Sequence, residues 1–205
     1  MYDEAGNLVI VVEVDHLTTF AVMRLIDVVE GVFSDIAGHW AAEFIMNLYE
    51  LGIIEGYEDG TYRPNIEVNR AEFTKMVLAA FDIDVPETVD EAPFSDVETG
   101  LWYTPYIAKA KELGIVEGYA DGTFRPTATV NRVEALKIVL EASGLAIEGG
   151  EMVFPDTIDG AWYEKYVAFA QLMEVVGGYS DGTFGPENSL LRSEVAKIVW
   201  NVMEL

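Results

Sequence analysis

Three arginines recur at a regular spacing in a chain that contains few cations. The sequence has 12 Lys and Arg residues against 36 Asp and Glu residues, and its formal net charge is −24. Arg70, Arg132 and Arg192 each precede a Glu by two residues, and each falls in the first turn of a predicted helix. The helix macrodipole disfavours a positive charge there, so helix stability does not explain these arginines. An Arg beside the N–H groups of a helix start suits a carboxylate or a phosphate, because both donate to the same anion.

A structural role for the arginines stays open beside this binding role. In the structural interpretation, each Arg pairs with a nearby aspartate such as Asp35 and stabilises the fold. The sequence alone does not separate the two roles.

Tryptophan and glycine recur with the same period as the arginines. A Trp at the start of an amphipathic helix is more often a core residue, but an aromatic face near an Arg is also the usual arrangement for holding an anionic sugar. A glycine permits close approach of the backbone to a ligand or forms a turn, and the turn is the favoured interpretation. The residues are Trp40, Trp102 and Trp162, with Gly56, Gly118 and Gly178.

The sequence offers no metal centre, cofactor site or catalytic group. Glu58 and Asp59 have a faint likeness to a calcium loop, but such a loop needs oxygens at five or six spaced positions. Asp59 is better explained as a turn former, and loose cation association with the acidic surface is favoured over a specific site. The chain has no cysteine, and its two histidines, His16 and His39, do not recur. We therefore expect no enzyme activity.

Two predicted helices in each repeat position these residues. In the first repeat a helix over about 40–52 carries Trp40, places Phe44, Leu48 and Leu51 on one side, and ends near Gly52. A tight Gly-Tyr-x-Asp-Gly-Thr turn with a positive φ at its second glycine follows. A second helix begins at Asn69, which forms a capping box with Glu72. Asn131 and Glu134 repeat this box, whereas Leu191 loses it in the third copy.

The second helix of each repeat has a wide apolar face. Apolar residues at the i, i+3, i+4, i+7 and i+8 positions predict that the three related helices pack together around a pseudo-threefold axis. One repeat is too small to bury such a face alone, so residues 31–205 should form one cooperative unit. We expect repeats over 31–84, 92–146 and 152–205. The face residues are Phe73, Met76, Val77, Ala80 and Phe81 in the first copy, and Val195, Ile198, Val199, Val202 and Met203 in the third.

Residues 1–30 differ from the repeats. Two apolar runs, Leu8 to Val14 and Phe20 to Ile26, predict a short β-hairpin or strand remnant, the tail of an upstream domain. We therefore expect the chain to be the C-terminal part of a longer protein. These residues show no signal-peptide pattern, and no apolar run is long enough for a transmembrane helix. The large negative charge disfavours nucleic-acid and anionic-lipid partners.

Three ordered motifs carry a family resemblance. Each repeat contains F-[SP]-D-x(4,5)-W, then G-Y-x-D-G-T-[FY]-x-P, then [NL]-R-x-E, and over roughly 33–205 the chain resembles the S-layer homology (SLH) domain. That family implies a mainly α, three-pronged pseudo-trimer around a central helical bundle, with ligand grooves between the prongs. Its members hold surface-layer proteins and exoenzymes non-covalently to cell-wall polymers, often through a pyruvylated sugar.

The resemblance implies a cell-surface location and a set of glycan-binding residues. A pyruvate ketal would supply the carboxylate that a first-turn Arg favours. Envelope polysaccharide is the expected partner, and other S-layer subunits are a further one. Carried over by motif, the binding residues are Arg70, Arg132 and Arg192; Gly56, Gly118 and Gly178; Trp40, Trp102 and Trp162; and Asp35, Asp96 and Asp156.

Some residues depart from the family pattern, and other functions stay open. Leu191 replaces the cap, and Gly185 stands where Arg63 and Arg125 occur, so we expect grooves that involve the third repeat to be weakened or altered. The high acidity leaves open a different anionic glycan of the envelope. One alternative function is a protein–protein assembly module of a surface lattice, assisted by calcium. Another is an accessory domain that tethers an enzyme.

Overall fold

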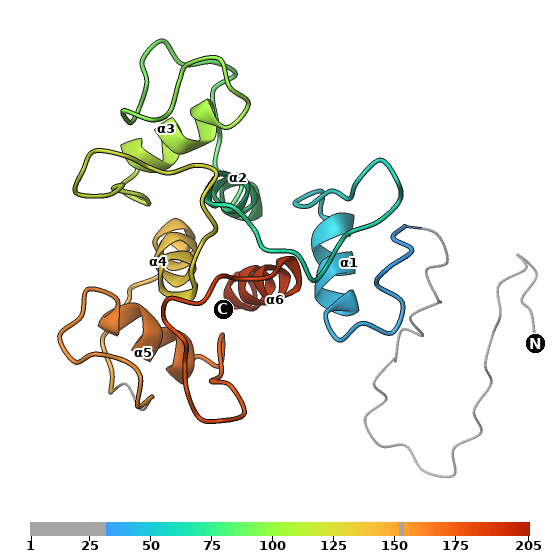
Figure 1. The fold of residues 1–205 in the computed structure, drawn as a ribbon, viewed down its shortest axis with the longest axis vertical. Coiled ribbons are helices and arrows are strands. Elements are labelled where there is room, and N and C mark those ends of the chain that lie inside the picture. The colour runs from blue at the N-terminus through green and yellow to red at the C-terminus, as the bar shows by residue number, and fades with distance from the viewer. Residues whose placement is uncertain (1–31, 152–153) are drawn as a thin grey trace, which may run out of the picture. The chain divides into compact units, whose positions relative to one another are not determined.

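A computed structural model describes residues 32–151 and 154–205, and these residues are mainly α-helical (Figure 1). The mainly α prediction is therefore confirmed. The predicted N-terminal strands lie outside the described residues. The helices are α1 (Ala42–Glu50), α2 (Arg70–Ala80), α3 (Thr104–Glu112), α4 (Arg132–Ser143), α5 (Glu164–Leu172) and α6 (Arg192–Met203).

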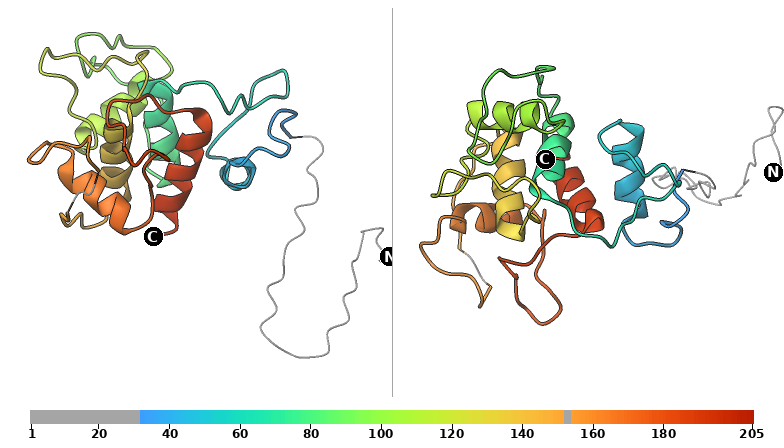
Figure 2. Two further views of the ribbon diagram at one scale, coloured as in Figure 1. Left: turned by 60° about the horizontal axis from the view of Figure 1, so that its bottom comes forward. Right: turned by 45° about the horizontal axis from the view of Figure 1, so that its top comes forward.

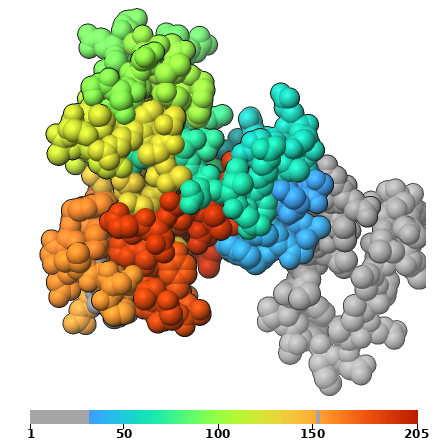
Figure 3. All heavy atoms as spheres, viewed as in Figure 1, coloured from blue at the N-terminus to red at the C-terminus, as the bar shows by residue number. Residues whose placement is uncertain are grey.

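The second helices of the three repeats form a central bundle. Helices α2, α4 and α6 contact one another, and Figure 2 shows them side by side. Helix α3 packs on α2, α5 packs on α4, and α1 packs on α6. The first helix of each repeat therefore lies on the second helix of the repeat before it, and the first repeat closes onto the last. In Figure 3 the third repeat, in orange and red, meets both neighbours.

The apolar faces predicted for the second helices line this bundle. Phe73, Met76 and Val77 are buried in α2, as are Val195, Ile198, Val199 and Val202 in α6, whereas Ala80 and Phe81 are half-buried. Each repeat adds one fully buried aromatic ring from the segment before its second helix. These rings belong to Tyr62, Phe124 and Phe184.

The helix caps agree with the sequence prediction. Asn69 accepts a hydrogen bond from the Glu72 N–H at 2.9 Å, and the Glu72 carboxylate accepts from the Asn69 N–H at 3.3 Å. In the third repeat, Leu191 has no side-chain acceptor, yet the Glu194 carboxylate still accepts from its N–H at 2.9 Å. Half of the capping box thus survives there.

A closed ring of backbone hydrogen bonds joins the three repeats. The Val68 N–H donates to the Leu190 carbonyl (3.0 Å), the Leu190 N–H to the Val130 carbonyl (3.1 Å), and the Val130 N–H to the Val68 carbonyl (3.0 Å). All three residues are fully buried. Each repeat therefore provides a hydrogen-bond partner for a buried backbone group of another repeat. Removing any one repeat would leave buried backbone groups of the other two repeats without partners.

The turns of each repeat are tied together by an aspartate. Gly60 has a φ of +76°, as predicted for the tight turn. The Asp35 carboxylate accepts hydrogen bonds from the Tyr62 and Arg63 N–H groups at 2.8 and 2.7 Å. Asp96 and Asp156 make the equivalent pair of bonds in their own repeats.

The first helix is shorter than the sequence predicted. It begins at Ala42, so Trp40 precedes it, and it ends at Glu50. Leu51, which was predicted to share one side of the helix with Phe44 and Leu48, follows the last helical residue and is 59% exposed.

Candidate functional site

Three grooves lie at equivalent places in the bundle, and each is lined by all three repeats. A groove takes a Gly-Tyr pair, a Glu and a Lys from one repeat, a Trp from the following repeat and an Arg from the preceding one, with the repeats counted cyclically. Groove 1 contains Gly56, Tyr57, Glu72, Lys75, Trp102 and Arg192; groove 2 contains Gly118, Tyr119, Glu134, Lys137, Trp162 and Arg70; groove 3 contains Gly178, Tyr179, Glu194, Lys197, Trp40 and Arg132.

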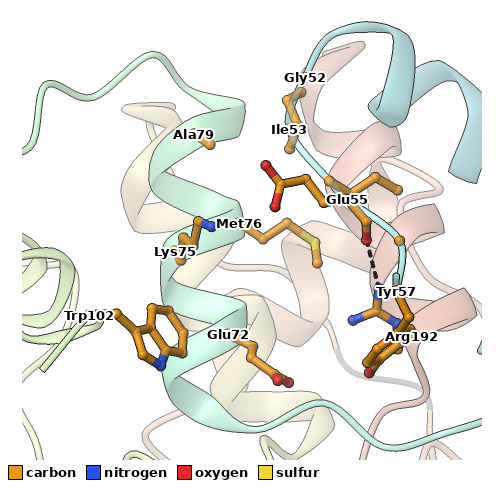
Figure 4. Close-up of a pocket in the computed structure, with 12 residues that line it drawn as sticks. Gly52, Ile53, Glu55, Tyr57, Glu72, Lys75, Met76, Ala79, Trp102 and Arg192 are labelled. Carbon is orange, nitrogen blue, oxygen red and sulfur yellow. Dashed lines mark hydrogen bonds between the residues drawn. The ribbon is translucent and has the colours of Figure 1, made fainter. Parts of the chain in front are cut away.

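Figure 4 shows how groove 1 is built. Helix α2 forms one wall and carries Glu72, Lys75 and Met76, and the Gly52–Tyr57 segment forms the other. The Arg192 guanidinium lies against Tyr57 and donates to the Glu55 carbonyl at 3.2 Å. The cavity volumes of grooves 1, 2 and 3 are about 300, 550 and 200 Å³. All three grooves are thus present, and groove 3 is the smallest.

The tryptophans are surface residues. Trp40, Trp102 and Trp162 are 56%, 54% and 55% exposed, so the interpretation of these residues as core is wrong. They escape burial because each lies in the turn before its helix. The Lys75 Nζ lies 5.9 Å from the centre of the Trp102 ring. Each groove therefore offers an aromatic face to solvent.

The arginines lie at the buried ends of the grooves, between repeats. Arg70 is 5% exposed, and its Nε donates to the Phe124 carbonyl at 2.8 Å. Its guanidinium carbon lies 4.9 Å from the Tyr119 ring centre and 4.6 Å from that of Phe124. Arg132 occupies the equivalent position beside the rings of Tyr179 and Phe184. Arg192 does so beside the rings of Tyr57 and Tyr62.

The helix N-termini do not add free donors to the grooves. The Arg70 N–H donates to the Ala128 carbonyl at 2.9 Å, and the Ala71 N–H donates to the Pro126 carbonyl at 3.0 Å. The first N–H groups of α4 and α6 are paired in the same way. The expectation that an anion shares these N–H groups with the arginine is therefore wrong, because a neighbouring repeat already occupies them.

Two of the arginines form ion pairs, but not with aspartate. Arg70 Nη1 lies 2.9 Å from Glu134 Oε2, and Arg132 Nη1 lies 3.6 Å from Glu194 Oε1. Asp35 is not their partner, because its carboxylate binds backbone N–H groups in its own repeat. The structural interpretation is thus correct about an ion pair and wrong about the residue that forms it.

We expect Arg70→Ala to destabilise the fold by about 3–5 kcal/mol, because it removes the cation that pairs with the part-buried Glu134 and leaves the buried Phe124 carbonyl without its donor. The matched control is Arg125→Ala. Arg125 is an exposed arginine of the repeat, paired with Asp121 at 2.9 Å. Its loss should leave the melting temperature almost unchanged. Equal melting temperatures for the two variants in circular dichroism would contradict the structural role of Arg70.

The glycines and aspartates differ in their relation to the grooves. Gly56, Gly118 and Gly178 line the grooves, and each also permits a close contact: a Cβ on Gly178 would lie 2.6 Å from Phe154 Cε1 and 2.8 Å from the Thr183 carbonyl. The aspartates Asp35, Asp96 and Asp156 are not brought into the grooves. Their carboxylates bind backbone N–H groups of the turns instead.

Sequence reasoning left several lining residues out of the site. Lys75, Lys137 and Lys197 recur with the repeat period, as do the tyrosines after the groove glycines. That periodicity was the signal that could have found them. A second arginine covers two of these tyrosines: the Arg63 guanidinium lies 3.8 Å from the Tyr57 ring centre, and that of Arg125 lies 4.0 Å from Tyr119.

The third repeat lacks this covering arginine. Arg63 and Arg125 adopt φ values of +58° and +60°, and Gly185 takes +68° at the same place. Glycine adopts this conformation without strain, so the replacement removes a cation but suits the turn. Tyr179 is consequently 37% exposed.

Several titratable groups near the grooves have shifted pKa values. Burial, and then the hydrogen bond to Glu134, raises the pKa of Tyr119 to about 12. Hydrogen bonds from Thr61 and then Arg63 lower the pKa of Asp59 to about 2, and Thr123 and Arg125 do the same for Asp121. At neutral pH Tyr119 is therefore an uncharged donor and both aspartates are anions.

Within 32–151 and 154–205 no group of three or more His, Cys, Asp or Glu side chains is arranged to hold a metal ion. No helix in those ranges has the length and apolar character needed to cross a membrane.

Comparison with known proteins supports the repeat assignment. A family model described as "S-layer homology domain" matches the chain three times, at 32–74, 93–136 and 153–196. The predicted three tandem SLH repeats are thus confirmed.

Curated relatives include both surface-layer proteins and enzymes. The chain is 30% identical to amylopullulanase of Thermoanaerobacterium thermosulfurigenes, over 98% of this chain and 11% of that protein. It is 32% identical to exoglucanase XynX of Acetivibrio thermocellus (84% and 16%) and 30% identical to S-layer protein EA1 of Bacillus anthracis (82% and 19%). The chain thus spans less than a fifth of the length of these relatives. The comparisons support a surface-anchoring role and confirm the predicted location outside the cell, at its surface.

Proposed function

Because the chain belongs to the S-layer homology domain family, we propose that it anchors a surface protein by binding an anionic envelope glycan in its three grooves. The observation that carries this proposal is the composition of each groove. An exposed Trp, a Lys and the end of a buried Arg converge there from three different repeats. Binding needs no bond-breaking chemistry, so we expect the role of these residues to be non-catalytic.

The groove chemistry matches a sugar that carries a carboxylate. An aromatic ring covers the C–H face of a sugar, while polar groups take its hydroxyls. Lys and Arg supply the positive charge that a carboxylate favours, as in a pyruvate ketal. In a chain of net charge −24, each groove brings together a Lys and an Arg, so an anionic ligand meets cations there despite the acidic surface.

Two matched probes test the proposal. One is a methyl glycoside that carries a pyruvate ketal, and the other is the same glycoside without the ketal. In isothermal titration calorimetry we expect the charged probe to bind at least about tenfold more tightly, a difference of about 1.4 kcal/mol. The preference should weaken as salt is raised. Equal affinity for the two probes, or no binding by either, would overturn the proposed function.

A lattice-assembly module is the second candidate. Ile158 and Leu172 of the third repeat are 67% and 73% exposed, where the second repeat has Glu98 and Glu112. The replacement of a carboxylate by an apolar side chain removes the cost of burying that charge in a contact with another protein. The two probes separate the candidates, because an assembly module does not distinguish a charged from an uncharged sugar.

A further inference from the structure

The three grooves differ in how their cations are paired. In groove 2 both cations have carboxylate partners: Arg70 lies 2.9 Å from Glu134, and Lys137 lies 3.2 Å from Glu117. Glu134 is further fixed by the Tyr119 hydroxyl, which donates to it at 2.6 Å. A third carboxylate, Glu187, also lines this groove. Groove 2 therefore neutralises its own positive charge.

In groove 1 the cations are not paired with carboxylates. Arg192 donates from Nε to the Tyr62 carbonyl at 2.8 Å and from Nη2 to the Glu55 carbonyl at 3.2 Å. Among the described residues, neither Arg192 nor Lys75 forms an ion pair. Figure 4 shows the Arg192 guanidinium and the Lys75 side chain on opposite sides of the groove. Both retain donors for an incoming anion.

Groove 3 lies between the other two grooves in how its cations are paired. Arg132 forms an ion pair with Glu194 at 3.6 Å, which is longer than the 2.9 Å ion pair of Arg70 in groove 2, and Lys197 has no ion pair within the described part of the chain. Gly177 occupies the position at which the other grooves carry Glu55 and Glu117. The lining of groove 3 thus has two cations and one carboxylate, whereas that of groove 2 has two cations and three carboxylates.

Pairing of this kind weakens anion binding. An anion that enters groove 2 must displace Glu134 from Arg70 and then lie beside the displaced carboxylate. The nearby carboxylates also repel it, which is how a site discriminates against an unwanted charge. An uncharged sugar meets neither penalty and still finds the exposed Trp162 face and the largest of the three cavities.

We propose that grooves 1 and 3 take the anionic group of the ligand, whereas groove 2 accepts an uncharged sugar and discriminates against the anion. This inference rests on the proposed function and adds that the grooves differ in the charge of the sugar that they bind. Glu134 is its specificity-determining residue.

Each groove contains its own tryptophan, so binding can be followed groove by groove. The indole N–H signals of Trp102, Trp162 and Trp40 report on grooves 1, 2 and 3 in two-dimensional NMR, and single Trp→Phe variants assign them. Trp200 lines none of the three grooves and serves as an internal reference. The probes are the methyl glycoside with a pyruvate ketal and the same glycoside without it.

With the charged probe, we expect Trp102 and Trp40 to reach half-saturation at a concentration about tenfold lower than Trp162. With the uncharged probe, Trp162 should respond at a concentration no higher than the other two. If Trp162 responds to the charged probe together with the other two or before them, the inference is wrong while the proposed function stands. If no indole signal responds to either probe, the proposed function itself fails.

Glu134→Gln tests the cause of the discrimination. Glutamine keeps the capping box but cannot neutralise Arg70, so the charged probe should reach half-saturation at Trp162 at a concentration about tenfold lower than in the unmodified chain. Glu112→Gln on α3 removes the same charge outside the grooves and should leave all three concentrations unchanged. Glu117→Gln removes the carboxylate that pairs with Lys137. Because the Glu117 side chain is exposed, this variant gives the same test without disturbing the interior. Unchanged binding at Trp162 in both groove 2 variants overturns the inference.

Discussion

A variant with alanine at Trp40, Trp102 and Trp162 should lose affinity for isolated wall polymer on the order of a hundredfold or more, because a polymer engages several grooves at once and loses this multivalent gain. Its melting temperature should stay close to that of the unmodified chain. All three rings are more than half exposed, so their removal leaves no cavity in the core. Co-sedimentation with wall polymer and a circular dichroism melt measure the two quantities.

The matched control replaces the same three residues by phenylalanine. Phenylalanine keeps an aromatic face but loses the indole N–H, so polymer binding should fall much less than in the alanine variant. Polymer affinity that is unchanged in the alanine variant would remove the grooves as the binding site. A large fall in melting temperature would contradict the surface position of the rings.

A chain that ends at Glu151, and so lacks the third repeat, should not fold cooperatively. The loss of the third repeat removes α6, on which α1 packs, and α5, which packs on α4. It also removes Leu190 from the backbone ring, which leaves the Val68 N–H and the Val130 carbonyl without partners. A solenoid would tolerate the loss of its last repeat, because there each repeat contacts only its sequence neighbours.

Urea unfolding followed by circular dichroism provides the measurement. The full chain should show one sharp transition, whereas the shortened chain should show a gradual one with a smaller slope. The comparison is with the triple alanine variant, which keeps all three repeats. A sharp transition in the shortened chain would show that the repeats do not depend on circular closure.

The sequence predicted which segments form helices better than it predicted which helices pack on one another. The capping box identified the start of α2, and the i, i+3, i+4 pattern identified both α2 and α6, because these signals are local. The same pattern cannot say which helix packs on which, so the pairing of α1 with α6 came only from the structure. The three-pronged arrangement followed from the family resemblance rather than from the periodicity.

The groove residues show the same limit. The recurrence of Arg70 and Trp102 marked them as notable, but their burial depends on contacts between repeats that no single repeat encodes. Arg70 reaches Glu134 of the next repeat, whereas Trp102 precedes its helix and stays exposed. Glu134 was recognised only as a cap, since its second role needs the arginine of another repeat.

The backbone ring of Val68, Val130 and Leu190 also has a consequence for biosynthesis. The ribosome synthesises Val68, which begins this ring, long before it synthesises Leu190, which completes the ring. A nascent chain therefore cannot complete the burial of the apolar faces of α2 and α4 until α6 emerges. Folding of the three repeats should accordingly follow their synthesis rather than accompany it.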